Sequence, residues 1–534
     1  MTGRPAARRQ PRLSRRTLLR SGAALAAGAG AVRLLDGSGA RAVRLASSAA
    51  TLRLPDSVPD PGRPAGTPHP AMPFDHVVVL MMENHSFDNF LGDLSRTRRD
   101  VVGQFSPGVD FVNFDSDGTA VAPWHLTSTC EADDVDQSWD CTHRSMFWGP
   151  GPSAEPDTSY RAPYDPAAFD WSRPLSQVPL AKPGMRGFVL ANGGPQTMGY
   201  WTAAELPFTH SMAQAFTVAN RWFCSAPCQT YPNRRFLMAG TAFGDIATDM
   251  STIIGGVPPT IATPPANGTI FDRLSGHGVT WRNYFTDLPA TGIIPTIIEK
   301  YPANVVPVQQ FFADCAAGTL PAVSFVDPEF GALGEVGAPL ASLPVVQSLP
   351  GVGDAGGFIQ TLSGSQEAPA NVAYGEEFVA QAVTAVLHSP AWARTLLIWT
   401  FDEHGGYADH VPPPAAIPPD GILPDLSAGD FAGAYDMYGP RVPAVVVSPY
   451  ARAGGVSNTL YDHTSVLATI EAKWNLPALT YRDANASTVL DCLDTTRPPR
   501  LDAPALAAPG LALPAGLRCT GRGDSTGTAS PALP

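Results

Sequence analysis

Short, continuously apolar runs mark the predicted β-strands of this chain. They occupy residues 77–82, 322–326, 396–401 and 442–447. A strand covered on both faces is apolar at every position, whereas a strand with one face in water alternates apolar and polar residues. The four runs therefore predict strands inside a sheet that has neither face in water.

Two other stretches repeat apolar residues at helical spacing. Residues 374–388 do so at positions such as Phe378 and Ala382 and stop before Pro390, and residues 464–474 form the second stretch. Strands that alternate with helices are typical of an α/β protein. The pattern predicts a mainly parallel central sheet with helices on both faces.

Composition divides the chain into four segments. A single catalytic domain is predicted at residues 74–493, preceded by an export segment at 1–42 and a Pro-rich linker at 43–73. Residues 494–534 are rich in Pro, Ala and Gly, which predicts an extended or disordered tail. We expect the linker to be poorly ordered as well.

The first segment has the features of a twin-arginine export signal. Arg15 and Arg16 precede a weakly apolar Ala/Gly run at residues 22–32, and residues 40–42 give a small-x-small cleavage pattern. The apolar run is much shorter than the ~20 residues that span a bilayer, which argues against a transmembrane anchor. We expect the twin-arginine machinery as a partner and a final location in the periplasm, the cell envelope or the extracellular medium.

The charge of the chain restricts its partners. The formal net charge is −13, which argues against a nucleic-acid partner and against a general affinity for anionic membranes. An acidic protein that acts on phosphate has to concentrate positive charge locally. A bound metal ion does this most directly.

Seven cysteines are consistent with an oxidising compartment. Proximity in sequence pairs six of them and leaves Cys315 over; the predicted pairs are Cys130 with Cys141, Cys224 with Cys228, and Cys492 with Cys519. Zinc binding by Cys224 and Cys228 is disfavoured, because no second pair of ligands stands nearby in the sequence.

Two acidic clusters stand at the ends of predicted strands. Glu83 and Asn84 directly follow the first apolar run, and Asp402 and Glu403 directly follow the third. Either pair alone would be typical of solvated loop acids or helix caps. Ligands bind at the carboxyl ends of parallel strands, so both pairs are expected to converge, and a cation would relieve the cost of gathering their charges. Hard oxygen donors favour one Mg²⁺, Mn²⁺ or Ca²⁺ ion over zinc or copper.

Thr230 is the predicted nucleophile. It lies like an N-cap two residues before Pro232, which suits a first helical turn. A helix N-terminus favours negative charge, both on an ionised hydroxyl and on the phosphate that it attacks. A plain structural cap is the alternative, and Ser225 and Cys228 are rival nucleophiles nearby.

Four motifs together resemble the phosphoesterase family of bacterial phospholipases C and acid phosphatases. They are Glu-Asn-His-Ser-Phe-Asp at 83–88, Thr-x-Pro-Asn-Arg at 230–234, Asp-Glu-His-Gly-Gly at 402–406 and Asp-His-Thr-Ser at 462–465. The motifs stand in the order of the family, and the resemblance covers about residues 72–475. It implies an alkaline-phosphatase-like α/β fold.

The same resemblance implies the composition of the site. One metal ion is expected at the positions that match Glu83, Asn84, Asp402 and Glu403. Thr230 matches the Ser or Thr nucleophile of the family and is expected to contact the metal too.

Two positions depart from the family pattern. The family has a His in an Asp-x-Asp-His-Ser-Trp stretch where this chain has Gln137, and a second His in a Gln-His-Pro-Pro stretch where this chain has Glu367. The resemblance implies that both imidazoles contact phosphate or protonate the leaving group. His404 and His410 remain candidates to orient metal ligands or to donate to phosphate, and His463 is predicted to be structural.

These features predict an exported, metal-dependent phosphoesterase that acts through a phospho-threonine intermediate. The expected substrate is a phosphate ester, phospholipids included, with cleavage of phospholipase C type first and of acid phosphatase type second. One alternative is a catalytically weakened relative that binds metal or phosphorylated ligands outside the cytoplasm. A sulfatase-like enzyme is disfavoured, because the chain lacks a Cys/Ser-x-Pro-x-Arg motif.

Overall fold

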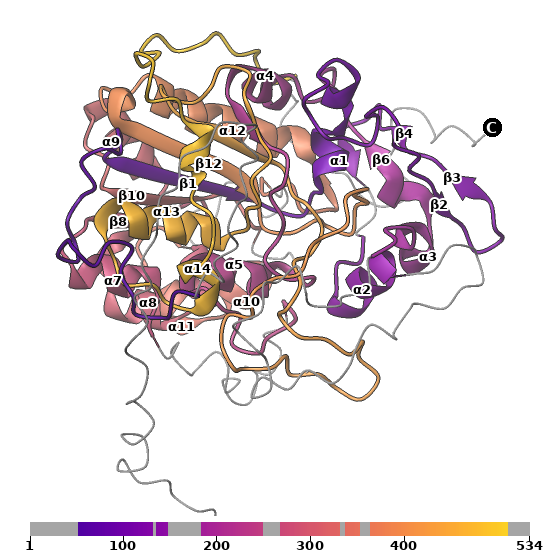
Figure 1. Ribbon diagram of the computed structural model, residues 1–534, viewed down its shortest axis with the longest axis horizontal. Coiled ribbons are helices and arrows are strands. Elements are labelled where there is room, and N and C mark those ends of the chain that lie inside the picture. Colours follow the sequence, from indigo (N-terminus) through magenta and orange to yellow (C-terminus); the bar gives the residue numbers. More distant parts are fainter. Residues whose placement is uncertain are drawn as a thin grey trace, which may run out of the picture. The chain divides into compact units, whose positions relative to one another are not determined.

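Among the described residues, the main sheet has eight strands in the order β14-β7-β13-β12-β1-β10-β8-β9. Figure 1 labels β12, β1, β10 and β8 of this sheet. The computed structural model describes residues 52–131, 135–147, 183–248, 267–331, 337–352 and 364–510. The strands of the sheet are β1 (His76–Met82), β7 (Thr217–Ala219), β8 (Trp281–Phe285), β9 (Val305–Pro307), β10 (Val323–Asp327), β12 (Thr395–Phe401), β13 (Ala444–Val447) and β14 (Val456–Ser457).

The sheet is parallel except at one strand. β1 pairs in parallel with both β10 and β12, and the parallel ladder continues through β8 to β9. β13 runs antiparallel to its two neighbours, β12 and β7, and β7 pairs in parallel with β14. The prediction of a mainly parallel α/β sheet is therefore confirmed.

Both faces of the sheet are covered. Every residue of β10, β12 and β13 is buried, as is every residue of β1 except His76. Helices α4, α9 and α12 pack together, and α5, α7, α13 and α14 form a second group. Their bounds are α4 Pro207–Ala215, α5 Thr230–Ala239, α7 Ile270–Gly276, α9 Gln309–Ala317, α12 Val372–Leu387, α13 Thr464–Trp474 and α14 Tyr481–Ala484.

Shorter elements surround the sheet. The other α-helices of the described residues are α1 (Phe87–Phe90), α2 (Trp139–Phe147), α3 (Phe188–Asn192), α8 (Thr296–Lys300), α10 (Gly337–Ala341) and α11 (Pro344–Gln347). Two-residue strands pair as β2 (Asn113–Phe114) with β3 (Ala120–Val121), β4 (Trp124–His125) with β6 (Gly199–Tyr200), and β5 (Cys130–Glu131) with β11 (Ala370–Asn371).

The predicted elements are confirmed. The four apolar runs form β1, β10, β12 and β13, and the two helical patterns form α12 and α13. The fourth strand begins at Ala444 rather than at residue 442. Pro443 precedes it and has no N–H to donate to a ladder, which agrees with a later start.

The described part of the predicted linker forms hydrogen bonds with the domain. The Asp56 amide donates to Ala478 O at 2.9 Å, and the His69 amide donates to Lys473 O at 2.6 Å. Asn475, in a left-handed conformation at the end of α13, donates from its side chain to Asp60 O. Carbonyls and amides at the end of a helix need partners, and this segment supplies them. Residues 1–51, with the predicted export signal, lie outside the described residues.

The first part of the predicted tail also packs against the domain. The Asp494 amide donates to Tyr450 O, and the Arg500 amide donates to Pro449 O, both at 2.8 Å. The side chain of Leu506 packs against the hydrophobic core. Residues 494–510 of the predicted tail thus contact the domain, and residues 511–534 lie outside the described part.

The predicted disulfide pairs are wrong. Free thiols are present at Cys141, Cys224, Cys228 and Cys492, and also at Cys315 as predicted. Cys130 is disulfide-bonded, so its partner is not Cys141. The Cys224 and Cys141 sulfurs instead contact the Ala226 carbonyl and the Asn192 side chain. Nearness in sequence did not predict which sulfurs face each other.

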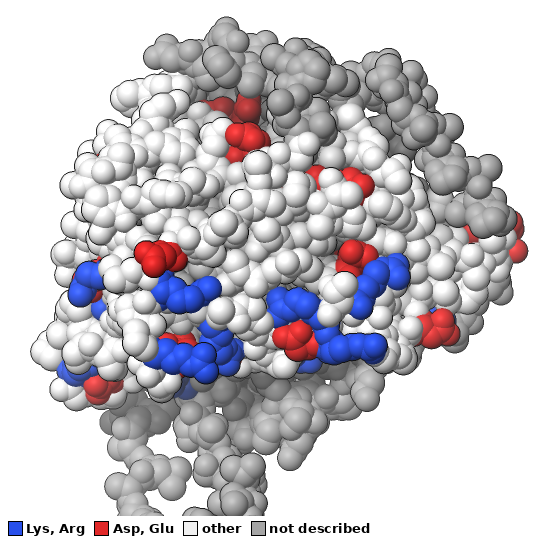
Figure 2. Space-filling view, turned by 90° about the horizontal axis from the view of Figure 1, so that it is seen from above, with Lys and Arg blue, Asp and Glu red and all other residues white. Residues whose placement is uncertain are grey.

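Charged side chains are mixed on the face shown in Figure 2. Basic side chains there lie among acidic ones along one side of the face rather than forming a continuous basic surface. None of the described helices is both long enough and apolar enough to cross a bilayer.

Candidate active site

The two predicted ligand pairs lie side by side because their strands are neighbours. Met82 at the end of β1 is in register with Phe401 at the end of β12, so both chains leave the sheet at the same level. The Asn84 amide donates to Asp402 Oδ1 at 3.2 Å. Asn84 has a φ of 66°, a left-handed conformation that Asn adopts more readily than most residues, and it turns the chain after the strand. All four side chains of the pairs are buried.

Thr230 joins this group from a third segment. It is the first residue of α5, and its Oγ1 donates to Asn84 Oδ1 at 3.4 Å. A hydrogen bond from Thr230 also opposes the effect of burial, which raises the pKa of Asp402. The predicted N-cap role is wrong: the cap residue is Gln229, and its side chain makes no capping bond. The Thr230 hydroxyl therefore points toward the ligand pairs rather than back into its own helix.

Arg234 lies between two of the carboxylates. Its Nη2 is 3.3 Å from Glu83 Oε1, and its Nε is 3.1 Å from Asp402 Oδ2. Burial raises the pKa of Glu83 well above its usual value, although the Arg234 charge opposes this effect. With all three buried carboxylates ionised, those of Glu83, Asp402 and Glu403, the group and the one guanidinium carry two net negative charges. A single divalent cation would balance that charge.

The donor chemistry fits such an ion. Glu83, Asn84, Asp402, Glu403 and Thr230 offer carboxylate, amide and hydroxyl oxygens, which suit Mg²⁺, Mn²⁺ or Ca²⁺. Within the described chain, however, the carboxylates of Glu83, Asp402 and Glu403 do not form a cluster with one oxygen from each within 4.8 Å of the others. We attribute the separation of these carboxylates to the Arg234 guanidinium, which contacts both Glu83 and Asp402.

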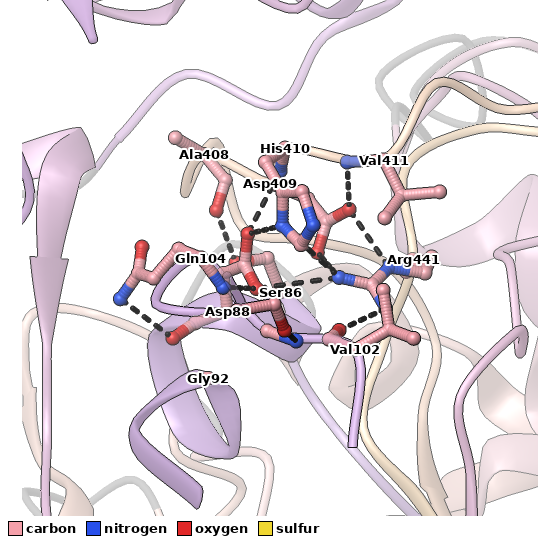
Figure 3. A network of polar contacts seen from close by, with 12 residues as sticks. Ser86, Asp88, Gly92, Val102, Gln104, Ala408, Asp409, His410, Val411 and Arg441 are labelled. Atoms are coloured by element: carbon pink, nitrogen blue, oxygen red, sulfur yellow. Dashed lines mark hydrogen bonds and ion pairs between the residues drawn. The ribbon is translucent and has the colours of Figure 1, made fainter. Parts of the chain in front are cut away.

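A second polar cluster does meet that distance in the described residues. Asp88, Asp409 and His410 have donor atoms within 4.8 Å of one another. Figure 3 shows that Arg441 points into this cluster and contacts both carboxylates. Because the guanidinium already supplies a positive charge there, we assign the cluster to an ion-pair network rather than to the metal site.

His463 and His404 lie beside the second ligand pair. Trp222 Nε1 donates to His463 Nδ1 at 3.4 Å, and an indole nitrogen can only donate. His463 Nε2 therefore carries the proton and donates to Asp402 O at 2.5 Å. His404 Nδ1 lies 3.0 Å from Glu403 Oε2. Burial lowers the pKa of each imidazole to about 3, so both are neutral at pH 7.

Of the two rival nucleophiles, Ser225 is hydrogen-bonded to other groups and Cys228 is protonated. Ser225 Oγ donates to Asp462 Oδ2 at 2.9 Å and accepts from the His463 amide at 3.3 Å. Burial raises the pKa of the Cys228 thiol well above its usual value, so the thiol keeps its proton. Thr230 is the candidate whose hydroxyl meets the ligand pairs.

A family model decides the classification. The model of the phosphoesterase family matches residues 74–477. The chain belongs to the phosphoesterase family. It is accordingly a hydrolase that acts on phosphoric ester bonds.

Curated relatives of this phosphoesterase are phospholipases C. Non-specific phospholipase C6 of Arabidopsis thaliana is 29% identical over 454 residues, which cover 81% of this chain and 74% of that protein. Phospholipase C B of Mycobacterium tuberculosis is 28% identical over 493 residues, which cover 82% of this chain and 81% of that protein.

Similarity to solved structures is weak. A protein in the alkaline phosphatase superfamily from Vibrio parahaemolyticus is 11% identical, with coverage of 58% of this chain and 66% of that one. Its TM-score of 0.31 is too low to support an argument.

The two departures from the family pattern lie in the interior of the phosphoesterase. Gln137 and Glu367 are both buried. The negative charge of Glu367 contributes to a raised pKa of Tyr231, the residue after Thr230, although burial is the largest cause. The backbone of Asp136, the residue before Gln137, lies against Gly406. Both positions are thus close to segments that carry the candidate site.

Two residues of the site, Arg234 and Ser365, had no predicted role. Arg234 ends the Thr-x-Pro-Asn-Arg motif, and its place in that motif was a signal that could have been used. Ser365 accepts the Glu83 amide at 3.0 Å through its carbonyl. No pattern around Ser365 pointed to this contact.

Proposed function

We propose that this phosphoesterase is an exported, metal-dependent enzyme that hydrolyses phosphate esters through a phospho-threonine at Thr230. The observation that carries the proposal is the contact of the Thr230 hydroxyl with Asn84 beside buried carboxylates. Phospholipase C-type cleavage is the first choice of reaction, because the curated relatives are named phospholipases C. Acid phosphatase-type cleavage of monoesters is the second.

The proposed reaction has two steps. Thr230 Oγ1 attacks phosphorus, the bond from phosphorus to the ester oxygen breaks, and the alcohol leaves with a proton. Water then attacks phosphorus, the bond from phosphorus to Thr230 Oγ1 breaks, and a proton of the water passes to Oγ1, which releases the phosphate product. A divalent cation held by Glu83, Asn84, Asp402 and Glu403 would polarise the phosphoryl oxygen and favour ionisation of the hydroxyl.

The chain's own residues have separate tasks in this scheme. The position of Thr230 at the start of α5 favours negative charge on its oxygen and on the substrate phosphate. Arg234 offsets part of the carboxylate charge that would otherwise repel the phosphate. His463 holds the Asp402 backbone through a hydrogen bond.

Export is supported by the sequence of residues 1–42 alone. Arg15 and Arg16 before a weakly apolar run favour the twin-arginine route and a location outside the cytoplasm.

Turnover of a chromogenic choline phosphodiester, with and without chelator, tests the proposal. Thr230→Ala should abolish turnover, Thr230→Ser should retain part of it, and chelation should remove it reversibly. Thr241→Ala is the matched control, because Thr241 hydrogen-bonds to Asp420 just beyond the other end of α5. Mass spectrometry after acid quenching should find the transferred phosphoryl group on Thr230. Wild-type turnover by Thr230→Ala would remove the covalent mechanism.

A weakened relative that only binds ligands is the second candidate. Gln137 and Glu367, in place of two family His residues, are the observation that favours it. Binding of a phosphorylated ligand without turnover of any mono- or diester in the same assay would support this candidate instead.

A further inference from the structure

Arg441 satisfies all of its hydrogen-bonding capacity inside the protein. A guanidinium has five N–H donors. Nε and Nη2 form a bidentate pair with Asp409 at 2.9 Å each, and Nη2 also donates to Asp88 Oδ1 at 3.2 Å. Nη1 donates to Val102 O at 2.8 Å and to Asn220 O at 2.9 Å. Figure 3 shows the guanidinium between the two carboxylates.

The two carboxylates belong to the segments that carry the metal-ligand pairs. Asp88 lies in α1, four residues after Asn84, and Asp409 lies six residues after Glu403. Arg441 also holds the first segment through its backbone, because its carbonyl accepts the Phe87 amide at 3.0 Å.

These two segments run side by side from the sheet to Arg441. The His85 amide donates to Glu403 O at 3.0 Å, and Ser86 Oγ donates to Ala408 O at 2.7 Å. At the far end, the His410 amide donates to Asp88 Oδ2 at 2.8 Å. The ligand pairs are therefore anchored at one end by β1 and β12 and at the other end by the Arg441 network.

The charges make the network hard to replace. Asp88, Asp409 and the Arg441 side chain are fully buried. Burial opposes ionisation of Asp88, but His410 and Arg441 outweigh it and lower the pKa of that carboxyl. Without the guanidinium, two buried carboxylates would face each other across the two segments and repel.

We propose that Arg441 is a positioning residue that holds together the two backbone segments of the metal-ligand pairs by clamping Asp88 to Asp409. This inference rests on the metal site of the proposed function. Lysine at this position would keep the charge but lose the bidentate fork and two of the five donors, so it could not hold both carboxylates and both carbonyls at once.

The test is Mn²⁺ binding by calorimetry on the purified full chain, with thermal unfolding measured on the same samples. Arg441→Lys should weaken Mn²⁺ binding at least tenfold. Asp409→Asn, which keeps the shape of the side chain, should also weaken Mn²⁺ binding. It replaces Arg441→Lys as the test if that variant does not fold. Arg98→Lys is the matched control, because Arg98 also bonds backbone carbonyls, three of them, and an Asp but does not contact the ligand segments. It should lower stability and leave Mn²⁺ affinity within twofold of wild type.

The outcomes separate the two proposals. Suppose that the Arg441→Lys and Asp409→Asn variants fold, unfold at a lower temperature than wild type and still bind Mn²⁺ with wild-type affinity. The network would then be purely structural, which would overturn this inference and leave the proposed metal site standing. A wild-type protein that binds no divalent cation would overturn the metal proposal and this inference with it.

Discussion

Gly405 is the position where one added methyl group should separate the ligand pairs. A Cβ built on Gly405 would lie 1.9 Å from Asn84 O and 2.4 Å from Asn84 C. Both are backbone atoms of a predicted metal ligand, so no side-chain rotation can relieve the overlap. Contacts below 3.0 Å are not tolerated, and Gly405→Ala must therefore move the two backbones apart by about 1.1 Å.

The size of this displacement decides the expected effect. Metal–ligand distances hold to about ±0.2 Å, so a shift of about 1.1 Å exceeds what coordination can absorb. Misplacement by about 1 Å can cost on the order of 100-fold in rate. Gly405 also has a φ of 61°, which costs an alanine about 1–2 kcal/mol. We expect Gly405→Ala to lower kcat/KM at least ~100-fold and to weaken metal binding.

Gly278→Ala is a control that has the backbone strain of a positive φ without displacing neighbouring atoms. Gly278 has a φ of 70°, and a Cβ there would meet no atom within 4 Å. This control should lose about 1–2 kcal/mol of unfolding free energy and keep full activity. Urea unfolding and kcat/KM on a chromogenic phosphodiester, measured for both variants, give the comparison. If Gly405→Ala keeps an activity within twofold of Gly278→Ala, the contact with Asn84 does not control the site.

The remaining predictions concern stability, substrate contacts and export. Burial and a neighbouring carboxylate raise the pKa of Glu471 well above 4.5, so the folded protein holds a proton that the unfolded chain releases. The contribution of this proton to folding stability is full below about pH 4.5 and falls as the pH rises toward the pKa of Glu471 in the folded protein. In urea unfolding, the Glu471→Gln variant should therefore be more stable than wild type at pH 8 but not at pH 4. Gln137→His combined with Glu367→His should raise kcat/KM on a phosphodiester, because losing one transition-state donor costs about 2.7–4 kcal/mol; a clear drop would mean that these residues suit another substrate. Replacing Arg15 and Arg16 together by Lys should leave the precursor in the cytoplasmic fraction, and normal export would refute the twin-arginine route.

Local sequence determined the sheet and the place of the ligand pairs. Four apolar runs became β1, β10, β12 and β13, because a strand covered on both faces must be apolar at successive positions. Glu83 and Asp402 each follow such a run directly, so parallel pairing of β1 with β12 was enough to bring them together. These features depend on patterns a few residues long, which a single sequence displays.

Tertiary structure alone decided how the candidate site is held and which hydroxyl lies beside the ligand pairs. Arg234 contacts Asp402 across 168 positions, and Ser225 is occupied by Asp462, 237 positions away. The described parts of the predicted linker and tail also bond, through their backbone groups, to carbonyls and amides that are distant in sequence. Each buried polar group must find a partner. Which partner it finds depends on the packing of the whole chain, and no local pattern records that choice.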